Sequence, residues 1–150
     1  MKLNLGCGND IRHGWKNYDL YPTSDKVQKL DLTQLPLPFE DDSVDEILLS
    51  HTFEHLTVNQ YSFMKELSRI LKKDGRLIIC VPVNHQCVEH ETSLFTTDYF
   101  DGLKTKLYGN LFHNIKIKYK PNSFKNCIMN LRKMMIWITK KEVTYKMEKK

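Results

Sequence analysis

The sequence predicts an α/β fold built on a doubly wound, mostly parallel sheet. Short apolar runs of strand length alternate along the chain with longer segments in which apolar residues recur at helical spacing. This alternation is typical of strand–helix–strand units, which form parallel sheets covered by helices. A chain of 150 residues has the size of an ordinary domain, so we expect residues 1–150 to form a single one.

Three short strands are expected in the first 32 residues. Residues 3–5 (LNL) lead straight into a turn that contains two glycines, and residues 15–20 (WKNYDL) form the second strand. Residues 27–32 are a weaker third candidate, because polar side chains interrupt the apolar pattern. Ligands of doubly wound sheets bind beyond the carboxyl ends of the strands, so the residues that follow each strand are candidates for a binding site.

The next segment predicts a strand and the clearest helix of the chain. After two prolines and a turn at 41–43, residues 44–50 (VDEILLS) form a strand with a strongly apolar second half. Thr57 and Gln60 have the spacing of a capping box, so we expect the helix to begin there and to stop at Gly75, after two lysines that suit its C-terminal end. Its apolar residues at helical spacing are Tyr61, Met64, Leu67, Ile70 and Leu71.

The second half of the chain predicts three further strands and a second helix. Residues 77–81 (LIICV) are a continuous apolar run, as expected of a buried central strand. We expect a helix over about 97–109 and a half-exposed strand where apolar residues alternate with lysines in 115–119. Residues 134–139 (MMIWIT) form the last predicted strand, and 141–150 are then a basic, solvated tail.

Composition excludes several classes of protein. The formal net charge of +5 is modest and partly due to five lysines in the last eleven positions, which argues against dedicated nucleic-acid binding. No apolar run approaches the roughly 18 residues of a membrane span, and the first ten residues do not resemble a signal peptide. Four scattered cysteines without a C-x-x-C pair fit reduced thiols. We therefore expect a cytoplasmic protein without membrane contact.

Candidate binding residues follow four successive predicted strands. Gly6 and Gly8 flank a turn where the backbone can approach a ligand without a side chain between them. Asp19, eleven residues beyond Gly8, can accept hydrogen bonds from both hydroxyls of a ribose. Asp31 can accept one from an adenine amino group, and His51 follows the fourth strand. Each residue alone is equally compatible with an ordinary turn, but their common place at strand ends favours a nucleotide-like ligand.

Four segments resemble, in order, the motifs of a known family. LNLGCGND, GWKNYDL, DLTQLPLPFEDDSVDEILLSHTFEHL and ELSRILKKDGRLIICVP are similar to the motifs of class I S-adenosylmethionine-dependent methyltransferases, within the small group that carries a type 11 methyltransferase domain. The resemblance covers about residues 1–83 and implies a Rossmann-like methyltransferase fold. It divides the chain into a cofactor half over about 1–83 and a substrate half over about 84–140.

The resemblance implies S-adenosylmethionine as cofactor and S-adenosylhomocysteine as product. It places the glycine turn beside the methionine part, Asp19 on the ribose hydroxyls, Leu20 against the adenine and Asp31 near the adenine amino group. The implied cofactor-binding residues are Leu5, Gly6, Cys7, Gly8, Asp19, Leu20, Asp31, Leu32 and His51.

The chain also departs from the family pattern. Many members have a helix before the first strand, whereas this sequence opens on the strand, and residues 8–15 are too short for a full first helix. We therefore expect a compact form of the fold that lacks the N-terminal helix. Another subunit could cover the cofactor side, which makes the chain a candidate homodimer.

Candidate catalytic residues follow from the chemistry of methyl transfer. The reaction is an in-line displacement for which an enzyme mainly supplies alignment, and a base is needed when the acceptor is a hydroxyl or a protonated amine. Possible bases are His51, Glu54 and His55 after the fourth strand and His85, His90 and Glu91 after the fifth. Glu54 and His55 can equally do no more than hold the start of a helix, and His90 and Glu91 can equally be solvated loop residues. His85, Cys87 and His90 lack a fourth metal ligand at a defined spacing, so we expect no metal. The candidate bases are His51, His55 and His85.

The expected function is methyl transfer to an oxygen or nitrogen of a small molecule or a glycan. Residues 50–53 (SHTF) do not resemble the Asn-Pro-Pro-aromatic motif of enzymes that methylate amino groups of nucleic-acid bases, which argues against such a substrate. The alternative is a non-catalytic module of the same fold that binds S-adenosylmethionine or a partner. A third hypothesis is a nucleic-acid methyltransferase that uses the lysine-rich end.

Overall fold

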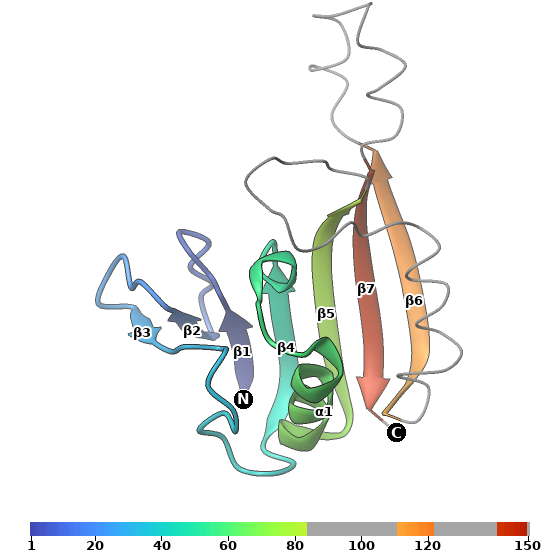
Figure 1. The fold of residues 1–150 in the computed structure, drawn as a ribbon, viewed down its shortest axis with the longest axis horizontal. Helices are drawn as coiled ribbons and strands as arrows, with labels where there is room; N and C mark the ends of the chain where they lie inside the picture. The colour runs from blue at the N-terminus through green and yellow to red at the C-terminus, as the bar shows by residue number, and fades with distance from the viewer. Residues whose placement is uncertain (84–110, 122–140, 150) are drawn as a thin grey trace, which may run out of the picture.

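A seven-stranded sheet runs through the molecule in the order β3-β2-β1-β4-β5-β7-β6 (Figure 1). The computed structural model describes residues 1–83, 111–121 and 141–149. The strands are β1 (Lys2–Leu5), β2 (Lys16–Asp19), β3 (Val27–Lys29), β4 (Val44–Ser50), β5 (Leu71–Val83), β6 (Phe112–Pro121) and β7 (Lys141–Lys149). A 3₁₀ turn, η1 (Phe53–His55), and a helix, α1 (Gln60–Ile70), follow β4.

The strand order creates a switch point between β1 and β4. The chain runs outward from β1 through β2 to β3, then returns to β4 on the other side of β1. The pairs β2–β3, β1–β2, β1–β4 and β4–β5 are parallel, and β7 is antiparallel to both of its neighbours. The predicted doubly wound, mostly parallel α/β fold is confirmed, and its ligand crevice is expected beyond the ends of β1 and β4.

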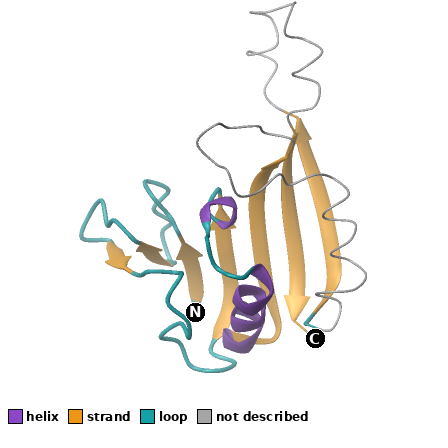
Figure 2. Ribbon diagram, viewed as in Figure 1, coloured by secondary structure: helices purple, strands orange, loops and turns teal. Residues whose placement is uncertain are grey.

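Helix α1 covers one face of the sheet over β4 and β5 (Figure 2). Its apolar residues recur at helical spacing and pack on strand residues that alternate along the chain, so both elements bury the stripe that their period creates. All of the core residues named next are at most 3% exposed. They are Leu3, Leu5, Ile47, Leu49, Leu77 and Ile79 from the sheet and Phe63, Met64, Leu67 and Ile70 from α1.

Residues 8–15 form no helix and are held to the sheet by a hydrogen-bonded pair of asparagines. The buried side chains of Asn4 on β1 and Asn17 on β2 lie 3.0 Å apart. Asn17 accepts from the Arg12 amide and donates to the Arg12 carbonyl, and Asn4 donates to the Asp10 carbonyl. The expectation that this segment is too short for a first helix is confirmed, and side-chain amides satisfy its backbone instead.

Both ends of α1 differ from the prediction. The helix begins after Asn59, whose side chain accepts from the Ser62 amide at 3.0 Å, so the capping box at Thr57 and Gln60 is wrong. It ends at Ile70, because Leu71 already pairs with Val44 in β5. The next pair between the two strands is Arg76 with Glu46, so residues 72–75 form an irregularity in the pairing of β5 with β4.

Gly75, predicted as the helix stop, has another role in that irregularity. A Cβ atom there would lie 2.7 Å from the Lys72 carbonyl oxygen, so the glycine allows a close approach of two backbone segments.

The C-terminal residues form a strand where a solvated tail was predicted. Lys141–Lys149 is β7, which lies between β5 and β6 and pairs with both. Its lysines therefore belong to the sheet, and the interpretation of 141–150 as a tail is wrong. The strand predicted around 115–119 is confirmed within β6. The predicted helix over 97–109 and strand over 134–139 lie outside the described residues.

An ion-pair network ties the loop before β4 to helix α1. Glu66 accepts from the buried Leu37 amide at 2.7 Å and from the Arg69 guanidinium at 2.6 and 2.9 Å. Arg69 also donates to the Leu37 carbonyl and contacts Asp41. Hydrogen bonds from Arg69 hold the pKa of the Glu66 carboxyl below its usual range. The network fixes the loop that begins at the third strand's carboxyl end.

Replacing Glu66 by alanine is expected to destabilise the domain by about 2–3 kcal/mol, since the buried Leu37 amide and part of the Arg69 guanidinium lose their hydrogen-bond acceptor. Urea unfolding would measure this, with Glu66→Gln expected to lose less because it keeps an acceptor for Leu37. Lys65→Ala, at an exposed position of the same helix, is the matched control. Equal stability of Glu66→Ala and Lys65→Ala would show that the network does not hold the loop.

Candidate functional site

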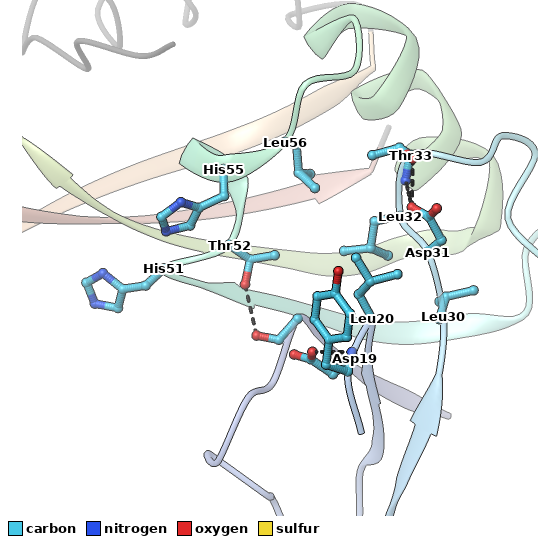
Figure 3. A pocket seen from close by; sticks show the side chains of 12 residues that line it. Asp19, Leu20, Leu30, Asp31, Leu32, Thr33, His51, Thr52, His55 and Leu56 are labelled. Atoms are coloured by element: carbon cyan, nitrogen blue, oxygen red, sulfur yellow. Dashed lines mark hydrogen bonds between the residues drawn. The ribbon is translucent and has the colours of Figure 1, made fainter. Parts of the chain in front are cut away.

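A cavity of about 420 Å³ opens at the carboxyl ends of β1, β2, β3 and β4 (Figure 3). This volume lies within the range of small-molecule sites, and the position is the switch point of the sheet. Its lining combines a glycine turn, carboxylates, apolar side chains and imidazoles. The lining residues are Gly6, Asp19, Leu20, Tyr21, Leu30, Asp31, Leu32, Thr33, His51, Thr52, His55 and Leu56.

The turn after β1 is held in a conformation that requires glycine. Gly6 has φ +67°, and a Cβ atom there would lie 2.2 Å from Thr52 Cγ2 and 2.4 Å from Thr52 Oγ1. The Thr52 hydroxyl lies 3.0 Å from the Gly6 carbonyl oxygen, and the Gly6 amide donates to the Tyr18 carbonyl at 2.8 Å. Gly8 also has positive φ, +49°, but faces open space. The turn is thus held from both sides, by β2 and by the loop after β4.

Asp19 ends β2 and binds the turn from the other side. Its Oδ2 accepts from the Gly8 amide at 2.8 Å, and its Oδ1 accepts from the Tyr21 amide at 2.9 Å. A carboxylate has about four lone-pair sites, so these two bonds leave acceptor capacity on the cavity side. The carboxylate therefore orders the glycine turn from a position in the cavity wall.

The wall after β3 combines a fixed carboxylate with apolar side chains. Asp31 Oδ1 accepts from the Thr33 hydroxyl at 2.7 Å and from the Thr33 amide at 2.9 Å, and these bonds lower the pKa of the Asp31 carboxyl. The leucines labelled in Figure 3 form the neighbouring surface, with Leu20 38% exposed and Leu32 buried. The predicted third strand is shorter than expected, because residues 30–33 leave the sheet and line the cavity.

Two histidines after β4 form the opposite end of the cavity. His51 has φ +54°, and its amide donates to the Cys80 carbonyl at 2.9 Å. His51 Nδ1 lies 3.6 Å and His55 Nε2 lies 3.9 Å from the same oxygen, Oε1 of Glu54. The labelled imidazoles lie beside each other in Figure 3, away from Asp31 and Leu30. This arrangement could accept a proton at the imidazoles and pair the resulting charge with the carboxylate.

The structure brings most of the sequence-predicted site residues to one cavity. Seven of them line it: Gly6, Asp19, Leu20, Asp31, Leu32, His51 and His55. Leu5 is fully buried in the core, and Cys7 is 6% exposed, with a pKa raised by burial of its thiol. Gly8 contributes its amide to Asp19 rather than to the lining. His85 lies outside the described residues.

Sequence reasoning missed five lining residues: Tyr21, Leu30, Thr33, Thr52 and Leu56. All five adjoin predicted site residues, which was the available signal. The contact of Thr52 with Gly6 had no signal in the sequence, since the two residues lie 46 positions apart.

Within residues 1–83, 111–121 and 141–149, no three His, Cys, Asp or Glu side chains are grouped so that they could hold a metal ion. The cluster around His85 that was considered for metal binding lies outside these ranges. The helices in the described part of the chain are also too short or too polar to cross a membrane.

Comparison with known proteins now gives the family. A family model described as a methyltransferase domain matches residues 8–79, which include the end of the glycine turn and strands β2 to β4 with most of β5. This part of the chain belongs to the methyltransferase-domain family. The methyltransferase domain thus contains eleven of the twelve residues that line the cavity, all except Gly6.

The methyltransferase domain has relatives in animals and archaea. Ribosomal RNA-processing protein 8 of Caenorhabditis briggsae is 28% identical over 118 residues, which cover 65% of this chain and 34% of that protein. Protein MJ0638 of Methanocaldococcus jannaschii is 30% identical over 101 residues, 67% of this chain and 36% of the relative. The chain therefore spans about a third of the length of these curated relatives.

A solved structure from Thermotoga maritima shares the fold. It is described as a SAM-dependent methyltransferase, possible histamine N-methyltransferase, and matches with a TM-score of 0.68 at 18% identity. The match covers 99% of this chain and 82% of the other.

Proposed function

We propose that the methyltransferase domain binds S-adenosylmethionine in this cavity and transfers its methyl group to an oxygen or nitrogen of an acceptor. The observation that carries the proposal is the convergence of Gly6, Asp19, Asp31 and His51, each from a different strand end, on one cavity. Their order along the chain is also the order of the family's motifs.

The residues of the cavity fit a sulfonium nucleoside. Gly6 lines the cavity without a side chain, and any larger residue would collide with Thr52. Asp19 offers a carboxylate with remaining acceptor capacity, as a ribose diol needs. Leu20 and Leu32 offer apolar surface for an adenine, and Asp31 offers an acceptor for its amino group. A bound S-adenosylmethionine would supply an activated methyl group on a positively charged sulfur.

His51 and His55 are the proposed bases. Both line the cavity at the end opposite Asp31, and both lie within 4 Å of the Glu54 carboxylate. An imidazole can take the proton that a hydroxyl or ammonium acceptor must lose. His85 stays a third proposed base.

The proposed acceptor is a small molecule or a glycan. RNA is a second candidate, because relatives that match 65% and 51% of this chain are named ribosomal RNA-processing protein 8. Steep weakening of RNA binding with salt would favour that acceptor, since phosphate contacts release counterions. Tight cofactor binding without turnover over a broad panel of acceptors would favour a non-catalytic module.

Calorimetric titration tests the proposed function. We expect S-adenosylmethionine and S-adenosylhomocysteine each to bind with one site per chain and to raise the unfolding temperature. Adenosine triphosphate is the control ligand, since it shares the adenosine but carries phosphates, and the described residues that line the cavity include no lysine or arginine. Absence of both heat and thermal shift with the two sulfur nucleosides would overturn the proposal.

A further inference from the structure

The histidine end of the cavity is assembled around one buried carboxylate. The Glu54 side chain is only 7% exposed, whereas the side chains of His51 and His55 are 53% and 43% exposed. One oxygen, Glu54 Oε1, lies 3.6 Å from His51 Nδ1 and 3.9 Å from His55 Nε2. The carboxylate thus lies within 4 Å of both imidazoles, and both histidines line the cavity.

The backbone conformation of His51 fixes this residue close to the Glu54 carboxylate. Its φ of +54° is a conformation that side-chain-bearing residues rarely adopt, and the hydrogen bond that the His51 amide donates to the Cys80 carbonyl holds it there. Such conformations persist where the surroundings over-determine them, and they often occur at functional sites. A fixed backbone and a nearby carboxylate together limit the orientations of the imidazole.

The charge of the cavity is opposite to that of the chain. The twelve described lining residues include Asp19 and Asp31 and no lysine or arginine, although the net charge of the chain is +5. Glu54 adds a third carboxylate at the histidine end, where burial reduces screening by water. A cationic acceptor would be attracted to this end, and a phosphorylated acceptor would be repelled.

On these grounds, and resting on the proposed function, we propose that Glu54 is a positioning residue for His51 and His55 and that the acceptor is an amine that enters as its ammonium ion. The ammonium proton passes to an imidazole, and Glu54 pairs with the imidazolium. The freed nitrogen lone pair then forms the bond to the methyl carbon while the carbon–sulfur bond breaks, and the sulfur keeps that electron pair. The imidazolium finally releases its proton to water.

Three matched probes test this inference on the intact chain saturated with S-adenosylhomocysteine. Benzylamine, benzyl alcohol and benzyl phosphate share one ring and differ in charge, and ligand-observed NMR measures their affinities. We expect benzylamine to bind at least about tenfold more tightly than benzyl alcohol, and benzyl phosphate to bind most weakly. A tenfold preference corresponds to one well-placed charge interaction of about 1.4 kcal/mol.

The variants separate a positioning role from a structural one. Glu54→Gln is expected to abolish the preference for benzylamine while leaving the affinity for S-adenosylhomocysteine within about twofold, and Glu54→Asp is expected to restore part of it. Glu40→Gln, at an exposed position, is the matched control and should keep the full preference.

Each outcome is decisive. Benzyl phosphate binding better than benzylamine would overturn the amine acceptor, and the wild-type comparison alone decides this if Glu54→Gln does not fold. An unchanged preference in a folded Glu54→Gln would overturn the role of Glu54. Wild-type protein that binds S-adenosylhomocysteine but shows no amine preference overturns only this inference. Failure to bind S-adenosylhomocysteine overturns the proposed function and the inference with it.

Discussion

Replacement of Asp19 by alanine is expected to weaken binding of S-adenosylhomocysteine by roughly 30- to 700-fold. The carboxylate is proposed to accept two hydrogen bonds from the ribose, and their combined loss amounts to about 2–4 kcal/mol. The same substitution removes the acceptors of the Gly8 and Tyr21 amides, so the glycine turn keeps its backbone bond to Tyr18 but loses its side-chain tie to the end of β2. Calorimetry at fixed salt measures the change.

Controls for this experiment are available on the same loop. Asp25→Ala removes an exposed carboxylate that does not line the cavity, and it should leave binding unchanged. Asp19→Asn keeps an oxygen acceptor for one backbone amide but loses the negative charge, so we expect an intermediate affinity. If Asp19→Ala lowered stability but bound S-adenosylhomocysteine as tightly as Asp25→Ala, Asp19 would be a structural residue only.

Gly6→Ala is expected to destabilise the domain by about 2–5 kcal/mol, which combines the strain of a side chain at positive φ with overpacking against Thr52. The new methyl group would lie 2.2 Å from Thr52 Cγ2, much closer than any van der Waals contact. Urea unfolding measures the loss. Gly8→Ala is the matched control, because it has φ +49° but no atom within 4 Å of the new Cβ, and it should lose only about 1–2 kcal/mol.

A double variant identifies the source of the Gly6 effect. Even the Thr52 Cβ would lie 2.9 Å from the new methyl group, so relief requires Thr52→Gly rather than Thr52→Ala. In a double-mutant cycle, Gly6→Ala should be less destabilising on the Thr52→Gly background by about 1–3 kcal/mol. Additive losses would contradict the proposed contact between the turn and the loop after β4.

The strands of the first half were predictable because each is a short apolar run bounded by residues that break strands. Val44–Ser50 was predicted with its observed bounds, and the first two strands differ from prediction by a residue or so at their ends. The end of α1 was not predictable. Two lysines followed by Gly75 are equally suited to a helix terminus and to an irregular strand, and the pairing of Leu71 with Val44 decides between them.

Strand β7 shows why the C-terminal part was misinterpreted. Val143, Tyr145 and Met147 alternate with polar residues, which is a strand period, but the surrounding lysines indicated a solvated tail. Its place in the sheet depends on antiparallel pairing with β5, some 60 residues earlier in the chain. Local pattern carries little information about such long-range pairing.

The site was predictable where chemistry depends on residue type at a strand end. Gly6, Asp19, Asp31 and His51 were identified in this way, and all four line the cavity. Thr52 was not identified, because its role depends on contact with Gly6 across the sheet. Glu54 was identified as a candidate base that can equally do no more than hold a helix start, and its position within 4 Å of two imidazoles is known only from the three-dimensional structure.

A crystal structure of the chain with S-adenosylhomocysteine tests the central claim most directly. We expect the ribose hydroxyls within hydrogen-bond distance of the Asp19 carboxylate, the amino-acid part along the backbone of Gly6 to Gly8, and the sulfur facing His51 and His55. A nucleoside bound elsewhere, or bound in this cavity with its ribose away from Asp19, would contradict the account.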